Sequence, residues 1–161
     1  MGTRTNIHFN YGTEIVSNIY RHYDGYPGKV EDGKEVEYGV LPDLLRFFRD
    51  VKEHAVAHGP RFGDPTYLAA KFVVWQAKEN TKKHTYNPDT GKMEVSGSTH
   101  HLDFLSLGVC VEDLGGIEFI YEVDCDDLDS EGFPSIRWKP AHAKRWRRKI
   151  YFSGKPVEAT G

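Results

Sequence analysis

The sequence predicts an α+β domain in which an antiparallel sheet, built from two hairpins, carries two helices packed on one face. Two β-prone stretches with turn signals, residues 5–23 and 102–124, flank helical stretches at 41–57 and 65–80. Hairpins that flank helices in this order favour a sheet with both helices on the same side. The 161 residues fit one domain. We expect it to span residues 1–153, with residues 154–161 as a frayed tail.

The first hairpin follows from β-prone residues on either side of a turn. Residues 5–9 are β-prone, the Asn-Tyr-Gly-Thr sequence at 10–13 supplies turn chemistry, and the β-prone pattern resumes at 14–23. Asp24-Gly25-Tyr26-Pro27-Gly28 ends the second strand, because glycine and proline interrupt strands and aspartate accepts turn hydrogen bonds. Residues 29–39 are polar and charged, and we expect a surface loop there.

Two helices are marked by proline near their starts. Pro42 lies in the first turn of a helix over 41–57, which ends at the His-Gly-Pro sequence at 58–60. A second helix has Asp64 as N-cap and Pro65 at its first position, and runs to about residue 80. The first helix carries an apolar stripe at helical spacing, formed by Leu41, Leu44, Leu45, Phe48, Val51 and Ala55.

The second half of the chain is expected to complete the sheet. Residues 82–99 are polar and form either a flexible loop or a short exposed hairpin. Residues 102–112 and 117–124 read as the second hairpin, around a Leu-Gly-Gly turn at 114–116. Residues 136–138 and 149–152 are short strands at the sheet edge.

Cysteine use and hydropathy point to the cytoplasm. Cys110 and Cys125 form neither a metal-binding spacing nor a disulfide framework, and two reduced thiols suit a reducing compartment. No apolar stretch approaches the ~20 residues that span a bilayer. The N-terminus lacks the apolar core of a signal peptide. We therefore expect a cytoplasmic protein with no membrane contact.

Charge is distributed unevenly behind a net value of −3. Residues 112–131 hold nine acidic side chains and no basic one, whereas residues 137–149 hold seven basic side chains and no acidic one. The two segments either neutralise each other or leave a basic surface for phosphate-bearing partners, nucleic acid or a host protein. The candidate cations of that surface, which alternate with Trp138 and Trp146 as in single-strand grooves, are Arg137, Lys139, Lys144, Arg145, Arg147 and Arg148.

The richest stretch in chemistry-bearing side chains runs from Tyr20 to Pro27. On a strand, Arg21 would share a face with Ile19, while His22 and Asp24 would share the other face. A His–Asp pair suits general-base work or metal ligation, and arginine among tyrosines suits phosphate binding with ring stacking. The alternative is an ordinary turn in which Arg21 pairs with a carboxylate. The predicted ligand-binding residues are Arg4, Tyr20, Arg21, His22, Tyr23, Asp24 and Tyr26.

No catalytic residue, metal ligand or cofactor is assigned from the sequence. The acidic run at 124–131 lacks the glycine and the distal glutamate of an EF-hand loop. The chain carries no phosphate-cradling glycine loop, nucleophile elbow or Cys–His protease pattern.

Three stretches resemble a set of small bacteriophage and bacterial proteins. These are the opening Met1-Gly2-Thr3-Arg4, the run from Tyr20 to Pro27, and Leu68-Ala69-Ala70, with a later Tyr-Glu-Val strand at 121–123. Proteins of that set begin Met-Gly-Thr-Arg and carry a Tyr-Arg-His/Gln-aromatic-Asp-Gly-Tyr-Pro signature. This sequence departs after Pro27, where residues 29–39 are longer and more charged. The resemblance implies a phage-type accessory protein in the host cytoplasm and transfers no mechanism.

Three functions are compatible with these features. The first is a non-enzymatic binder of a small anionic, nucleotide-like ligand, which a phage could use to sequester a host defence signal. The second is a phosphodiester or nucleotide hydrolase with His22 as base, Asp24 as its orienting partner and Arg21 stabilising charge. The third is an inhibitor or nucleic-acid-binding module that uses residues 137–149. A homo-oligomer is compatible with all three.

Overall fold

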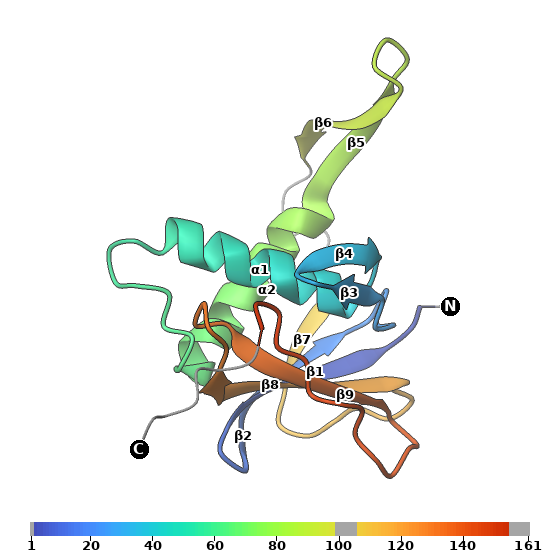
Figure 1. The fold of residues 1–161 in the computed structure, drawn as a ribbon. Coiled ribbons are helices and arrows are strands. Elements are labelled where there is room, and N and C mark those ends of the chain that lie inside the picture. The colour runs from blue at the N-terminus through green and yellow to red at the C-terminus, as the bar shows by residue number, and fades with distance from the viewer. Residues whose placement is uncertain (1, 99–105, 155–161) are drawn as a thin grey trace.

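The computed structural model describes residues 2–98 and 106–154, and its centre is a five-stranded sheet. The strand order is β7-β2-β1-β8-β9, and two helices lie across one face of the sheet (Figure 1). The predicted α+β class with helices on one face is thus confirmed. The strands are β1 (Thr5–Tyr11), β2 (Glu14–Arg21), β7 (Leu107–Cys110), β8 (Phe119–Leu128) and β9 (Pro134–Pro140).

The predicted first hairpin is present, but the predicted second hairpin is wrong. β1 and β2 pair antiparallel, whereas β8 pairs parallel with β1 and antiparallel with β9, and β7 pairs with β2. The sheet is therefore mixed rather than built from two hairpins. Burial explains why β8 pairs with β1 in the interior of the sheet and not with β7, since β8 carries the fully buried Tyr121 and Val123. Short β7, with Val109 80% exposed, fits only an edge.

Both predicted helices are confirmed, as α1 (Val40–His54) and α2 (Pro65–Thr81). The Asp64 carboxylate accepts from the backbone nitrogen of Tyr67 at 3.4 Å, as an N-cap does. The core between helices and sheet is rich in rings: α2 places Phe72 with its ring centroid 5.9 Å from that of Phe9 on β1. Neither described helix combines the length and apolarity needed to cross a bilayer.

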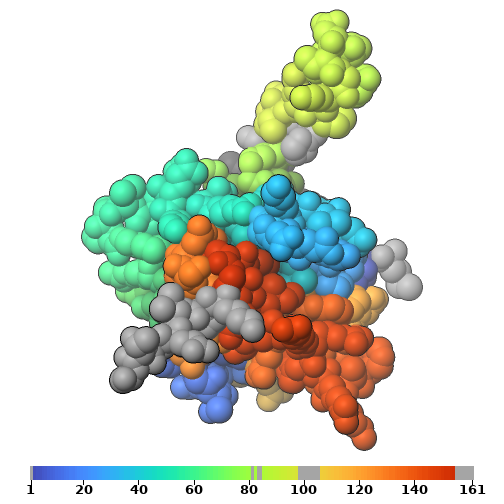
Figure 2. Space-filling model, in the orientation of Figure 1, coloured from blue at the N-terminus to red at the C-terminus, as the bar shows by residue number. Residues whose placement is uncertain are grey.

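Two small hairpins flank α1 and α2. Residues 29–39, expected as a loop, contain the hairpin of β3 (Lys29–Glu31) and β4 (Lys34–Glu37). Asp32 and Gly33 both have positive φ there, as the tightest hairpin turns require. Residues 82–98 form the hairpin alternative, β5 (Lys82–Asn87) with β6 (Lys92–Ser98), which continues α2 and stands clear of the body (Figure 2).

Three further expectations concern the chain ends and gaps. The predicted strand at 149–152 is reduced to one bridge between Ile150 and Ile136. Residues 102–105 of the predicted second hairpin lie outside the described residues. The predicted tail lies outside them as well, apart from Gly154.

The two cysteines, both reduced, should differ sharply in reactivity. Burial, with Asp124 nearby, raises the pKa of Cys125 to about 12. At pH 8, about one such thiol in ten thousand is a thiolate, against roughly a quarter for an ordinary thiol. We expect Ellman's reagent to titrate one thiol, Cys110, in the native protein and the second only in denaturant. Two thiols reacting together in buffer would contradict the buried placement of Cys125.

Candidate functional site

The turn that follows β2, residues 22–28 and here called the motif turn, is held closely against the N-terminal segment. The backbone nitrogen of Gly25 donates to Thr3 O at 2.9 Å. A Cβ on Gly25 would lie 2.6 Å from Thr3 O, so only glycine fits at this position. The Tyr121 hydroxyl, from the centre of the sheet, donates to Gly25 O at 2.7 Å. The glycine of the motif is therefore required by packing.

The motif turn also starts α1. Val40 N donates to Tyr26 O at 2.9 Å, and Leu41 N donates to Pro27 O at 3.0 Å. The first backbone N–H groups of a helix have no partner within the helix. Because the motif turn supplies acceptors for two of them, α1 begins at Val40 without a side-chain cap. The position of the turn is thus fixed by both the sheet and the helix.

Arg21 supports the motif turn from inside the protein. Its side chain is on the helix-facing side of the sheet and the residue is only 3% exposed. Its Nη1 atom lies 2.7 Å from Asp43 Oδ2 and donates to Gln76 Oε1 at 2.9 Å. Its Nε and Nη2 atoms donate to the backbone oxygens of Tyr23 and Asp24, at 2.9 and 3.1 Å. Arg21 therefore pairs with a carboxylate inside the protein, which was the alternative to ligand binding. It is not among the residues that line the neighbouring hollow.

Five of the seven predicted ligand-binding residues line one hollow of about 790 Å³, hereafter the ligand hollow. Its walls come from residues 2–4, from the motif turn, and from Gly116 and Glu118. Tyr20 is not among the lining residues, but its hydroxyl lies 2.6 Å from Nδ1 of His22, which is one of them. The five lining residues are Arg4, His22, Tyr23, Asp24 and Tyr26.

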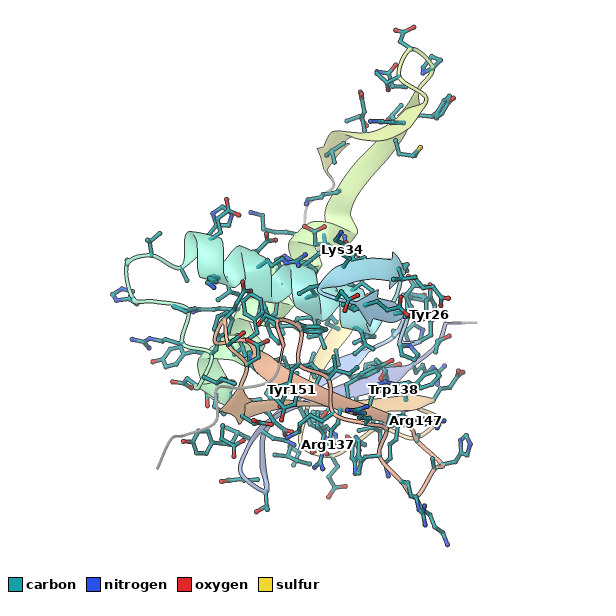
Figure 3. All side chains as sticks on the ribbon, in the orientation of Figure 1. Tyr26, Lys34, Arg137, Trp138, Arg147 and Tyr151 are labelled. Carbon is teal, nitrogen blue, oxygen red and sulfur yellow. The ribbon has the colours of Figure 1, made fainter. Side chains whose placement is uncertain are left out.

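The ligand hollow combines aromatic rings with charges of both signs. Tyr23 and Tyr26 are 45% and 37% exposed, and the Tyr26 ring lies edge-on to Tyr38 beside the β3–β4 hairpin (Figure 3). Partial burial and then the Asp24 carboxylate raise the pKa of Tyr26. Arg4 supplies a guanidinium to the hollow, and Asp24 and Glu118 supply carboxylates. The arrangement can stack a ring, accept from N–H or O–H groups, and meet one negative charge.

His22 and Asp24 do not form the pair that the strand alternation predicts. β2 ends at Arg21, and Asp24 has a φ of 55°, so the alternation of faces stops before it. Among the described residues, the side-chain hydrogen-bond partner of the His22 imidazole is the Tyr20 hydroxyl, and the His22 ring packs edge-on to Tyr23 with centroids 4.5 Å apart. The geometry expected of a general base and its orienting carboxylate is therefore not assembled here.

The wall that contains Gly116 and Glu118 is anchored to the sheet face opposite the helices. Asp113 Oδ1 lies 2.7 Å from His8 Nε2 and accepts from Asn18 Nδ2 at 2.8 Å. Glu118 N donates to Arg4 O at 2.8 Å. Sequence reasoning missed this buried polar face. Its signal is the polar alternation along β1, and its buried members are Asn6, His8, Asn10, Asn18, Glu122 and Asp124.

The wall should control ligand affinity without touching ligand. We expect Asp113→Ala to weaken binding in the ligand hollow severalfold, because the carboxylate holds the wall through His8 and Asn18. Calorimetry with a nucleotide that binds in a thermal-shift screen measures the change in affinity. Glu112→Ala, an exposed neighbour on the same segment, is the matched control. Equal affinities for the two variants would contradict an anchoring role.

Two other hollows also hold aromatic rings and charges of both signs, but none of the predicted ligand-binding residues lines them. One of about 870 Å³, larger than the ligand hollow, lies between the β3–β4 hairpin and residues 150–154. The other, about 640 Å³, is a mainly apolar groove between α1 and α2.

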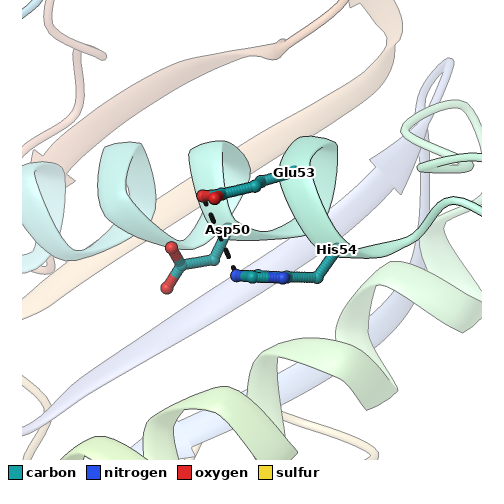
Figure 4. Close-up of side chains that lie close together, drawn as sticks. All are labelled: Asp50, Glu53 and His54. Atoms are coloured by element: carbon teal, nitrogen blue, oxygen red, sulfur yellow. Dashed lines mark ion pairs between the residues drawn. The ribbon is translucent and has the colours of Figure 1, made fainter.

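Three side chains near the apolar groove have metal-binding chemistry (Figure 4). Asp50, Glu53 and His54 each bring one ligand atom within 4.8 Å of the others. They are neighbours on the last turns of one helix, the group gains no fourth member from the described residues, and Asp50 already accepts from Trp75 Nε1 at 2.7 Å. We therefore assign no metal to it.

Comparisons with protein-family models, curated proteins and solved structures gave no match for this chain.

Proposed function

We propose that this protein binds a small anionic, nucleotide-like ligand in the ligand hollow without transforming it. The observation that carries the proposal is the convergence of Arg4, His22, Tyr23, Asp24 and Tyr26 on one hollow of about 790 Å³. Pockets of about 300–1,000 Å³ are typical of small-molecule sites. The resemblance to phage proteins extends the proposal to an accessory protein of the host cytoplasm that sequesters a signal nucleotide.

The side chains divide between the parts of a nucleotide. Tyr23 and Tyr26 offer ring faces or edges to a base, and Asp24 and Glu118 offer acceptors to base N–H or ribose hydroxyl groups. Arg4 and His22 offer donors to phosphate. Because the hollow holds one arginine and two carboxylates, a ligand with one or two phosphates and a donor-rich base fits better than a highly charged polyphosphate.

A thermal-shift screen of mononucleotides and cyclic dinucleotides tests the proposal. Ligand at about 100 times its Kd adds roughly 2.7 kcal/mol to the free energy of unfolding. For a chain of this size that corresponds to a rise of about 5–10 °C in the thermal midpoint. No shift with any nucleotide in the panel would reject the proposal.

Variants then locate the binding site. We expect Tyr26→Ala and Arg4→Ala each to weaken binding about tenfold or more, because they remove a stacking surface and the guanidinium of the hollow. Tyr11→Ala is the matched control, since Tyr11 is 55% exposed at the end of β1 and outside the hollow. A loss with Tyr11→Ala equal to that with Tyr26→Ala would place the ligand elsewhere. Unchanged nucleotide after long incubation separates binding from hydrolysis.

A further inference from the structure

The seven basic side chains of residues 137–149 divide into two groups in the structure. Arg137 Nη2 lies 2.8 Å from Glu122 Oε1, and Lys149 Nζ lies 3.1 and 2.7 Å from Asp124 Oδ2 and Asp127 Oδ2. These two cations neutralise the acidic strand β8. Neutralisation within the chain is therefore real, but it occupies only the two ends of the basic segment.

Two further cations shape the loop that joins these ends, residues 141–149, which we call the basic loop. Lys139 Nζ donates to Ala143 O at 3.1 Å and lies 5.1 Å from the Trp146 ring centroid. Arg147 lies 5.5 Å from the Trp138 ring, and its backbone nitrogen donates to Trp138 O at 2.8 Å (Figure 3). These contacts fix the backbone of the basic loop against β9.

Lys144, Arg145 and Arg148 are left without such a role. All three are exposed and take part in no side-chain hydrogen bond, ion pair or ring contact with the described residues. Together with the exposed Arg147 they place four positive charges within residues 144–148. The whole chain carries a net charge of −3, so this positive surface is local and is not a consequence of overall composition.

We propose that the basic loop binds the phosphate backbone of single-stranded nucleic acid without regard to sequence. Closely spaced lysines and arginines bind phosphates by releasing condensed counterions. Trp146 carries Arg137 and Lys139 over its ring, at 4.8 and 5.1 Å from the centroid, and helps to hold the loop in place. The exposed arginine side chains can stack on bases, which favours a strand whose bases are free. A loop of this length makes no base-specific contacts in a groove. We therefore expect sequence preferences no larger than those that follow from how strongly different bases stack.

This surface is distinct from the ligand hollow, although the two are neighbours. Ala141 N, at the start of the basic loop, donates at 2.9 Å to the backbone oxygen of Glu118, which lines the hollow. The proposal does not depend on nucleotide binding in the hollow. A negative mononucleotide screen with positive strand binding would reject the proposed function and keep this one.

Fluorescence anisotropy of a labelled 15-nucleotide oligo-dT, titrated with the full chain between 50 and 200 mM NaCl, tests the proposal. For single strands, log K falls with log salt at about −0.7 per phosphate contacted, which gives about −3 for four contacts. The triple variant Lys144→Gln, Arg145→Gln, Arg148→Gln should lose about 2 of that slope and at least tenfold in affinity at 50 mM salt.

The matched control is Lys29→Gln, Lys34→Gln, Lys92→Gln, which removes the same charge from exposed positions on β3, β4 and β6. This control should bind the oligonucleotide with the salt slope of the unmodified protein and with an affinity within twofold of it. Absent or salt-independent binding, equal losses in the two triples, or equally tight binding of a 15-base-pair duplex would each overturn the proposal. Single Lys144→Gln and Arg145→Gln variants, each expected to remove about 0.7 of slope, decide the matter if the triple variant unfolds early.

Discussion

Replacing Arg21 with methionine is expected to lower the free energy of unfolding by about 3–5 kcal/mol, the usual cost of removing one partner from a buried ion pair. Arg21 and Asp43 are each only 3% exposed, so the variant leaves a buried carboxylate facing a methionine. It also leaves Gln76 and two backbone oxygens of the motif turn without their donor. Urea unfolding at pH 7 measures the change in free energy. In a thermal melt, the same loss corresponds to a fall of roughly 6–20 °C in the midpoint.

Arg46 provides the control for this prediction. It bonds the other oxygen of the same carboxylate at 2.6 Å, but its side chain is 38% exposed. Arg46→Met should therefore cost less than about 1 kcal/mol. The double variant Arg21→Met, Asp43→Leu should recover much of the loss, because it removes the buried charge as well as its partner. Equal stability of Arg21→Met and Arg46→Met would show that the guanidinium is not a structural element.

The role of Arg21 shows how far the sequence could be read. Alternation along the strand places Arg21 on the same face as Ile19, which is the buried face, so its inward direction was predictable. Its partners were not, because Asp43 and Gln76 come from two different helices. The density of polar groups from Tyr20 to Tyr26 singled out a segment of which four residues line one hollow, and ligand binding there stays a prediction.

Strand pairing was the least predictable feature. Local turn signals correctly gave the β1–β2 hairpin, and the same reasoning wrongly paired residues 102–112 with 117–124. The parallel pairing of β1 with β8 joins Thr5 to Phe119, a separation that no local pattern encodes. The β3–β4 hairpin was predictable from Asp32-Gly33, a strong hairpin signal that the charge of the segment obscured.

The buried polar face escaped prediction for a different reason. Polar residues at alternate positions, such as Asn6, His8 and Asn10, normally indicate the solvent side of a half-buried strand. Here they are at most 5% exposed. Asn6 bonds with Asn18, His8 with Asp113 and Asn10 with Glu122. Only the tertiary contacts of residues 111–118 reveal that this side of the sheet holds a wall of the ligand hollow in place.

Replacing Lys149 with methionine should lower the free energy of unfolding by about 2–3 kcal/mol at pH 7, somewhat less than for a fully buried pair because Lys149 is 34% exposed. The ammonium contacts both Asp124 and Asp127, and the variant leaves these two carboxylates facing each other with no cation between them. Lys144→Met, which removes an exposed lysine of the same loop, should stay within about 0.5 kcal/mol of the unmodified protein.

The pH dependence of this loss gives the prediction a specific signature. Burial raises the pKa of Asp124 in the folded protein, and Lys149 opposes that rise. Without Lys149 the folded pKa moves further above the unfolded value of about 3.9. The folded variant then binds a proton that the unfolded chain releases, so its stability increases as pH falls from 7 towards 5. Urea unfolding should show the difference in stability between the variant and the unmodified protein narrowing as the pH falls over that interval.

A loss independent of pH would mean that Asp124 does not carry the effect, and no loss at all would mean that Lys149 has no structural role. The positive charge assigned to the basic loop would then have to include Lys149, and the salt slope for strand binding would be steeper by about 0.7 than the four-cation value. Unfolding and strand-binding experiments thus test the same assignment, in which some cations stabilise the fold and others bind nucleic acid. Lys149→Met should change stability and leave the salt slope alone, whereas Arg145→Gln should change the slope and leave stability alone.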